Sequence, residues 1–316
     1  MLDRTLTRRA LLAGAAGALM RARSRAAAAV AFGVPRGACD CHTHVFGDPA
    51  TFPFWSGRTY TPEPASVTQL QALHTSLGLD RVVIVHPSVY GTDNRCTLDA
   101  LARLGSRARG IAVIDDAIPD AQLDAMHAAG VRGIRLNLET FGQVDPGAGR
   151  QRFRRAVERL ARRPWHVQLY ARPSIVEALE ADVMVCPIPV VFDHFGGAQA
   201  AAGVDQAGFT SLRRMVGAGK AYVKVSAAYR VSSGKDFADV IPLARALIAA
   251  NPQRILWGSD WPHPNGAPRP GGTASDIVPA LAVDDVGLFN QLAVWAPDAG
   301  LRKTILVENP ARLFGF

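Results

Sequence analysis

A closed (β/α)8 barrel of the TIM type is the fold class that this 316-residue sequence predicts. Short apolar runs alternate with helical patterns along most of the chain, which is typical of parallel strands joined by crossover helices. Eight such units follow one another in roughly 270 residues, about the size of such a barrel. A doubly wound open sheet is the alternative, but no Gly-x-Gly-x-x-Gly sequence follows the first strand. We expect residues 32–316 to form one domain.

The predicted elements follow in order. The strands cover residues 38–46, 81–88, 110–115, 131–138, 166–171, 190–195, 221–227 and 255–259. The helices cover residues 66–79, 95–104, 120–129, 151–162, 173–181, 209–218 and 237–250, and two more at 286–295 and 302–314 close the chain. Ser66 and Pro119 are suited to start their helices. The segment 46–64 is rich in Pro, Gly and aromatic residues, so we expect an active-site loop there.

Residues 1–31 have the composition of an export signal. They hold six arginines and one aspartate, so this segment carries +5 of the net charge of +8. Thr-Arg-Arg-Ala-Leu-Leu at 7–12 resembles a twin-arginine motif, and a short apolar stretch and a run of small residues follow it. We therefore predict a twin-arginine-type signal over 1–31 and a periplasmic mature protein. A disordered basic tail or a misassigned start is the alternative.

Charge and hydropathy also argue against some classes of protein. The +3 left after the leader gives no reason to expect a nucleic-acid partner. No run of 18 or more apolar residues predicts a membrane span, so we expect no membrane association after export. None of the four cysteines forms a Cys-x-x-Cys pair, which argues against a structural zinc site.

Two histidines and a distant aspartate are the first candidates for chemistry. The motif Asp-Cys-His-Thr-His at 40–44 ends the first strand, and alternate residues of a strand share a face. We therefore expect the motif's aspartate, His42 and His44 on one face and Cys41 on the other. Two converging imidazoles can bind a metal ion or polarise a carbonyl, and Asp260, after the last strand, can supply a base. The alternatives are surface histidines in a loop and a turn aspartate.

Other polar side chains gather where a barrel of this type has its active site. The carboxyl ends of the predicted strands carry His42, His44, His86, Ser88, Arg135, Asn137, Tyr170, Asp193, His194, Lys224, Ser226, Asp260 and His263, with Tyr229 and Arg230 just beyond. Scattered surface residues would not favour strand ends so consistently.

Several motifs together resemble one known family. They lie at 40–44, 89–94, 132–137, 192–197 (Phe-Asp-His-Phe-Gly-Gly), 257–262 (Trp-Gly-Ser-Asp-Trp-Pro) and 308–314. In these, and over nearly everything after the leader, the chain resembles the amidohydrolase superfamily in its amidohydrolase-related branch. Within it, the chain is similar to the lactonases of 2-pyrone-4,6-dicarboxylate and of sugar acids.

The resemblance implies the hydrolysis of a carboxylated lactone. Asp260 would activate a water molecule, and His42, His44 and His194 would polarise the lactone carbonyl. Substrate binding is implied for Arg135, Arg230, Ser88, Tyr170 and Tyr60. Arginine pairs well with carboxylates, although both arginines can also form salt bridges at the barrel rim.

The resemblance also leads us to favour a site without a metal ion. Metal-dependent members carry further ligands on strands four and five, where this chain has Arg135, Asn137 and Tyr170. The alternative is a single zinc ion on His42, His44 and Asp260.

The second arginine that the pyrone-dicarboxylate lactonases carry after strand four is replaced by Phe141, and Glu139 lies nearby. We therefore expect a lactone with one carboxylate or none. A lactone isomerase and a metal-dependent decarboxylase are the enzymatic alternatives, and a periplasmic ligand-binding barrel is the non-enzymatic one. The oligomeric state is open.

Overall fold

The strands form one parallel sheet that closes on itself. The computed structural model describes residues 29–140, 142, 145–234, 236–267 and 271–316. The sheet runs in chain order through β1 (Cys39–Thr43), β3 (Arg81–Val85), β4 (Ala108–Ala112), β5 (Val131–Asn137), β6 (His166–Tyr170), β7 (Val190–Phe192), β8 (Ala221–Ser226) and β9 (Ile255–Gly258). At the seam, Asp260 N–H donates to His42 O (2.8 Å) and His44 N–H donates to Trp261 O (2.8 Å). The predicted barrel and all eight strands are confirmed.

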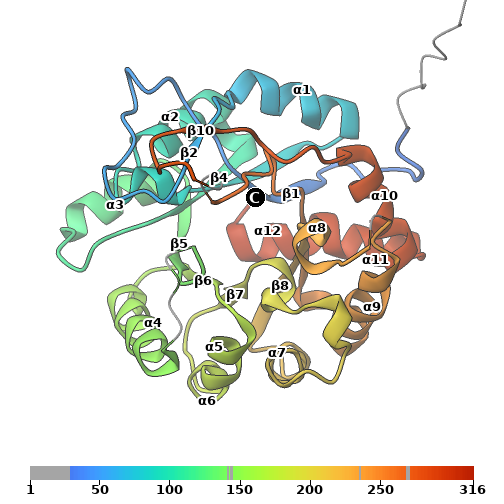
Figure 1. Cartoon of the computed structure of the whole chain (residues 1–316). Coiled ribbons are helices and arrows are strands. Elements are labelled where there is room, and N and C mark those ends of the chain that lie inside the picture. Colours follow the sequence, from blue (N-terminus) through green and yellow to red (C-terminus); the bar gives the residue numbers. More distant parts are fainter. Residues whose placement is uncertain (1–28, 141, 143–144, 235, 268–270) are drawn as a thin grey trace, which may run out of the picture.

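Helices surround the strands (Figure 1). They are α1 (Val67–Leu77), α2 (Arg95–Leu104), α3 (Asp120–Ala128), α4 (Pro146–Leu160), α5 (Pro173–Ala178), α6 (Glu180–Met184), α7 (Ala207–Gly217), α8 (Ala228–Val231), α9 (Ile241–Ala250), α10 (Asp285–Trp295), α11 (Ala299–Lys303) and α12 (Asn309–Phe314). Ser66 caps α1 as predicted, accepting from Gln69 N–H while the Gln69 side chain accepts from Ser66 N–H.

Two helix predictions were wrong in their bounds. Helix α4 begins at Pro146 and not at 151, because Asp145 accepts hydrogen bonds from the first free N–H groups and proline suits the first turn. The expected single helix over 302–314 is instead α11, a wider π-helical turn over Thr304–Glu308, and α12.

The prediction for the two faces of β1 was right for His42 and His44, which both contact Asp260, and wrong for Asp40 and the cysteines. Cys39 and Cys41 pack inside the barrel with side chains of five other strands and with Phe314 of α12. Asp40 instead pairs with His74 of α1 (3.3 Å). The pairing of β1 with β3 shifts register between Asp40 and Thr43, and such a bulge interrupts the alternation of faces.

Two long loops meet at the end of the barrel that carries the strand-end polar residues. The loop predicted at 46–64 ends in β2 (Thr61–Pro62), which pairs in parallel with β10 (Ile277–Val278).

Most of the predicted leader, residues 1–28, lies outside the described residues. Ala31 N–H donates to Asn290 Oδ1 of α10 (2.7 Å). Among the described residues, no helix has the length and apolar character needed to cross a bilayer.

The barrel seam makes a prediction about Gly258. A Cβ atom there would lie 2.6 Å from His42 Cβ and 2.8 Å from His42 N, which is too close without movement of β1 or β9. We expect Gly258→Ala to destabilise the fold by about 1–3 kcal/mol, measured as a lower apparent Tm. Gly217→Ala in α7 is the matched control, because its Cβ meets only Ala250 O at 3.8 Å. Equal Tm values for the two variants would contradict the close packing at the seam.

Candidate active site

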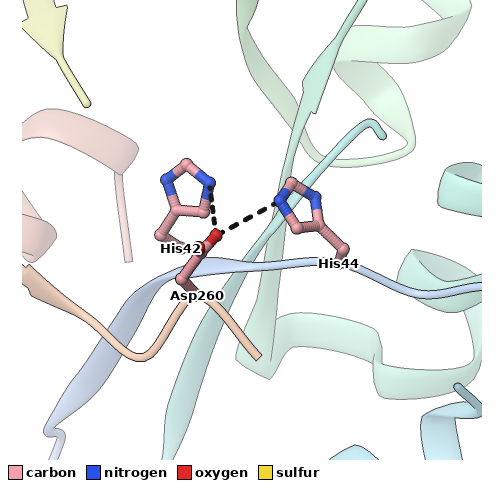
Figure 2. Close-up of side chains that lie close together, drawn as sticks. All are labelled: His42, His44 and Asp260. Carbon is pink, nitrogen blue, oxygen red and sulfur yellow. Dashed lines mark ion pairs between the residues drawn. The ribbon is translucent and has the colours of Figure 1, made fainter. Parts of the chain in front are cut away.

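Asp260 lies at the meeting point of three imidazoles. Its Oδ1 atom is 3.5 Å from His42 Nε2, 3.4 Å from His44 Nε2 and 3.8 Å from His194 Nε2. Figure 2 shows the first two contacts ending on one carboxylate oxygen. Asp260 has a φ of 64°, a left-handed conformation that costs a non-glycine residue on the order of 1–3 kcal/mol. The structure therefore brings together the four residues that the sequence suggested for catalysis, and places two of them, Asp260 and His194 (φ 47°), in left-handed backbone conformations.

The other oxygen of Asp260 is held by two donors. Tyr229 Oη donates to Oδ2 (2.6 Å) and Arg230 Nε donates to it (2.9 Å). Burial alone would raise the pKa of Asp260, but the neighbouring His194 and Arg230 hold it well below its usual range. Asp260 is therefore a carboxylate at neutral pH. Arg230, expected to bind substrate, also donates to Pro264 O (2.6 Å), and Tyr229 had been given no role.

The partner of each Nδ1 atom restricts the protonation of the rings. His44 Nδ1 lies 2.8 Å from Val85 O, and a carbonyl oxygen only accepts, so this nitrogen carries a hydrogen. In a neutral His44 ring, Nε2 is then a second acceptor facing Asp260. A proton, a water molecule or a cation belongs between these two acceptors. His194 Nδ1 instead meets Ser226 Oγ (2.8 Å), a hydroxyl that can donate or accept. Burial lowers the pKa of His194 to about 4, so the ring is neutral at pH 7.

A charged network inside the barrel lies beside His42. Asp193 Oδ2 accepts from Arg135 Nε (3.1 Å) and from Gln168 Nε2 (3.0 Å). Lys224 Nζ donates to Gln168 Oε1 (2.7 Å) and lies 3.3 Å from Asp193 Oδ1. Asp193, Gln168 and Lys224 are almost fully buried. The sequence placed Asp193 and Lys224 at strand ends without a role, and no signal singled out Gln168, in the middle of β6.

A cavity of about 240 Å³ opens above Asp260. It is lined by His44, His194, Asp260 and all five residues predicted to bind substrate, Arg135, Arg230, Ser88, Tyr170 and Tyr60. His42 does not line it and is fully buried. Arg135 lies over the Tyr170 ring, 5.2 Å from its centre. Glu139 also lines the cavity, and its carboxylate pairs with Arg172 (3.1 Å). The cavity therefore joins a carboxylate base to two guanidinium groups.

Two groups of side chains among the described residues have the chemistry of metal ligands. They are His42, His44 and Asp260, and His42, Asp193 and His194, with donor atoms within 4.8 Å of one another in each group. His44 and Asp260 present acceptor atoms to a common point, as metal ligands do. Lys224 Nζ, however, lies 3.2 Å from His42 Nδ1, and a cation so close opposes a second positive charge. The side chains present thus fit a metal ion only in part.

Comparison with known proteins identifies the family of this chain. Residues 39–316 match the amidohydrolase family model. The chain belongs to this amidohydrolase family. It is 38% identical to a 4-sulfomuconolactone hydrolase of Rhizobium radiobacter over 93% of this chain and 94% of the relative. It is 37% identical to a 2-pyrone-4,6-dicarboxylate hydrolase of Comamonas testosteroni, over 90% and 92% of the two chains.

The chain is also similar to a solved structure. That structure comes from a Pseudomonas putida protein proposed to be a 2-pyrone-4,6-dicarboxylic acid hydrolase. It superposes with a TM-score of 0.73 at 32% identity, over 89% of this chain and 98% of the other. These named relatives are hydrolases of small cyclic esters or are proposed to be so, which confirms the family resemblance drawn from the motifs.

Buried neutral histidines near the site make a pH prediction. Burial lowers the pKa of His86 to about 4, and its ring contacts Thr97 Oγ1 and Gly91 O, both at 3.0 Å. A depressed pKa means that its contribution to stability is full above pH 6.5 and is lost as the pH falls towards 4. We expect the apparent Tm of the wild type to drop between pH 7 and pH 4.5, and to drop less in His86→Gln. An equal drop in both proteins would contradict the neutral state of His86.

Proposed function

We propose that this chain hydrolyses a small carboxylated lactone, either a 2-pyrone-4,6-dicarboxylate-like compound or a sugar-acid lactone. The observation that carries the proposal is one cavity that holds the Asp260 carboxylate, the His194 ring and the Arg135 and Arg230 guanidinium groups. A base beside a polar hydrogen-bond donor suits the attack of water on an ester carbonyl. The lactone hydrolases among the relatives support the same chemistry.

Each step of the reaction has a candidate residue. Asp260 Oδ1 takes a proton from the attacking water, while Tyr229 and Arg230 keep the other oxygen in place. His194, whose Nδ1 can accept from Ser226, presents Nε2–H to the lactone carbonyl oxygen as negative charge develops there. The acyl–oxygen bond of the ring then breaks, the ring oxygen takes the proton from Asp260, and a hydroxy acid is released.

The imidazoles of His42 and His44 have roles in this proposal that differ from that of His194. A neutral His44 donates no hydrogen bond from Nε2, because Val85 O holds the hydrogen on Nδ1. His44 polarises the carbonyl, as first expected, only when it is an imidazolium. His42 is buried away from the cavity, so it supports the base and does not touch the substrate.

Substrate size and charge follow from the cavity. About 240 Å³ is below the range for drug-sized ligands, so a single small ring fits best. Among the described residues, Arg135 donates a hydrogen bond only from Nε, to Asp193, and Arg230 donates from Nε to Asp260 and from one terminal nitrogen to Pro264 O. Glu139 in the same wall disfavours a second negative charge. We therefore propose that, within these two classes, a lactone with one carboxylate is preferred to a dicarboxylate. We also propose catalysis without a metal ion, because Lys224 Nζ lies 3.2 Å from His42 Nδ1 and opposes a second positive charge.

The direct test is hydrolysis of a lactone panel by the purified protein, followed with a pH indicator. The panel holds the pyrone dicarboxylate, muconolactones, and aldonic- and aldaric-acid lactones. We expect activity that survives a chelator. We expect Asp260→Asn to lower kcat by about 10²–10⁴-fold, because the base is lost. Arg135→Lys should mainly raise KM, because lysine makes no bidentate pair with a carboxylate.

Other outcomes have a definite meaning. Activity that is lost with the chelator and restored by zinc would assign His44 and Asp260 to a metal site and would favour the decarboxylase alternative. Exchange of one lactone for another without acid release would identify an isomerase. Ligand binding without turnover, unchanged in Asp260→Asn, would leave a binding protein.

We also propose that the protein is exported through a twin-arginine signal in residues 1–31. The support is the Arg8–Arg9 pair ahead of a short apolar stretch. Replacing both arginines by lysine should trap a tagged protein in the cytoplasm, as judged by fractionation. Lysine at Arg21 and Arg23 is the matched control and should leave export intact. Equal periplasmic yield from all variants would contradict this route.

A further inference from the structure

The ammonium group of Lys224 is enclosed by acceptors inside the barrel. Its Nζ atom lies 2.7 Å from Gln168 Oε1, 3.2 Å from His42 Nδ1 and 3.3 Å from Asp193 Oδ1. The side chain is fully buried, so it makes no contact with bulk solvent. An ammonium group has three hydrogens to donate and nothing to accept. The contacts to Gln168 Oε1 and His42 Nδ1 have hydrogen-bond geometry, whereas the contact to Asp193 Oδ1 is an ion pair without a well-aligned hydrogen bond.

The partners of Gln168 fix the direction of this network. An ionised Asp193 only accepts, so the amide nitrogen of Gln168 faces Asp193 Oδ2 and its oxygen faces Lys224. Lys224 then satisfies a second hydrogen only if His42 Nδ1 is also an acceptor. If Nδ1 carried a hydrogen, two donors would face each other at 3.2 Å, and one would stay unpaired in the barrel interior.

Asp193 competes weakly for the same nitrogen. Its Oδ1 atom lies 3.2 Å from His42 Nδ1, but it has no well-aligned hydrogen-bond donor among the described residues. The contact from Lys224 to Nδ1 has hydrogen-bond geometry. The balance therefore favours a His42 ring with its hydrogen on Nε2, the atom that lies 3.5 Å from Asp260 Oδ1.

We propose that Lys224 is a positioning residue that holds His42 in the Nε2–H tautomer and so denies His42 Nε2 to a metal ion. A metal ion needs the lone pair of a ring nitrogen. With Nε2 protonated, only His44 and Asp260 of the first ligand group remain, one fewer than the three protein ligands of a catalytic zinc site. His42 Nε2–H instead faces Asp260 and stabilises its negative charge.

The proposal is tested by the ring ¹⁵N spectrum of His42, assigned by its loss in His42→Asn. We expect a protonated Nε2 and an unprotonated Nδ1 in the wild type. Lys224→Met should move the hydrogen to Nδ1, where Asp193 accepts it. Lys224→Gln retains an N–H donor and should retain the wild-type tautomer. Lys220→Met, an exposed position before β8, is the matched control. A protonated Nδ1 in the wild type would overturn the proposal, whether or not any variant folds.

Zinc binding gives an independent readout. By equilibrium dialysis we expect Lys224→Met to bind zinc about 10- to 100-fold more tightly than the wild type and Lys220→Met, because His42 Nε2 becomes a free ligand. Equal affinities would overturn the metal-excluding role.

The kinetic consequence rests on the proposed lactonase function. A positioning role predicts a kcat about 10- to 100-fold lower in Lys224→Met with little change in KM, because Lys224 does not line the cavity. An unchanged kcat would overturn the positioning role. The spectrum and the zinc affinity need no substrate, so a wrong assignment of the lactone is distinguishable from a wrong assignment of Lys224.

Discussion

The two oxygens of the Asp260 carboxylate have different partners, and the rest of the site depends on that division. Tyr229 and Arg230 hold Oδ2, while Oδ1 faces the imidazoles and the cavity. The barrel seam makes this possible, because Asp260 N–H donates to His42 O of β1 and because Gly258 leaves room for that strand. The contacts that close the barrel at this seam therefore also orient the Asp260 carboxylate.

Inside the barrel, the buried carboxylate of Asp193 is paired with the buried cations of Lys224 and Arg135. A buried ion pair is a weak source of stability, since the loss of hydration offsets much of the attraction. Asp193 and Lys224 lie inside the barrel all the same, and with Gln168 they leave few polar atoms without a partner. The position of Asp193 and Lys224 beside His42 offers a functional reason for burying these charges despite the lost hydration. We propose that the network sets the state of the His42 ring, which supports the Asp260 carboxylate.

The sequence predicted the architecture better than the details of the site. The alternation of buried strands with amphipathic helices depends on local composition, so all eight strands were found. The bulge in β1 was not, because it depends on pairing with β3, and it turns Asp40 away from the two histidines. Gln168 was missed for the same reason. A glutamine in the middle of a strand has no meaning until Lys224 and Asp193 are seen beside it.

In the proposed reaction, Asp260 activates water and does not attack the lactone itself. The most direct measurement is a single turnover in ¹⁸O-labelled water with enzyme in excess, followed by mass spectrometry of the product and of the peptide that contains Asp260. If Asp260 is a general base, we expect one ¹⁸O atom in the new carboxylate of the hydroxy acid and none in Asp260. Label in Asp260 and an unlabelled first product would show a covalent acyl-enzyme, and Asp260 would then be a nucleophile.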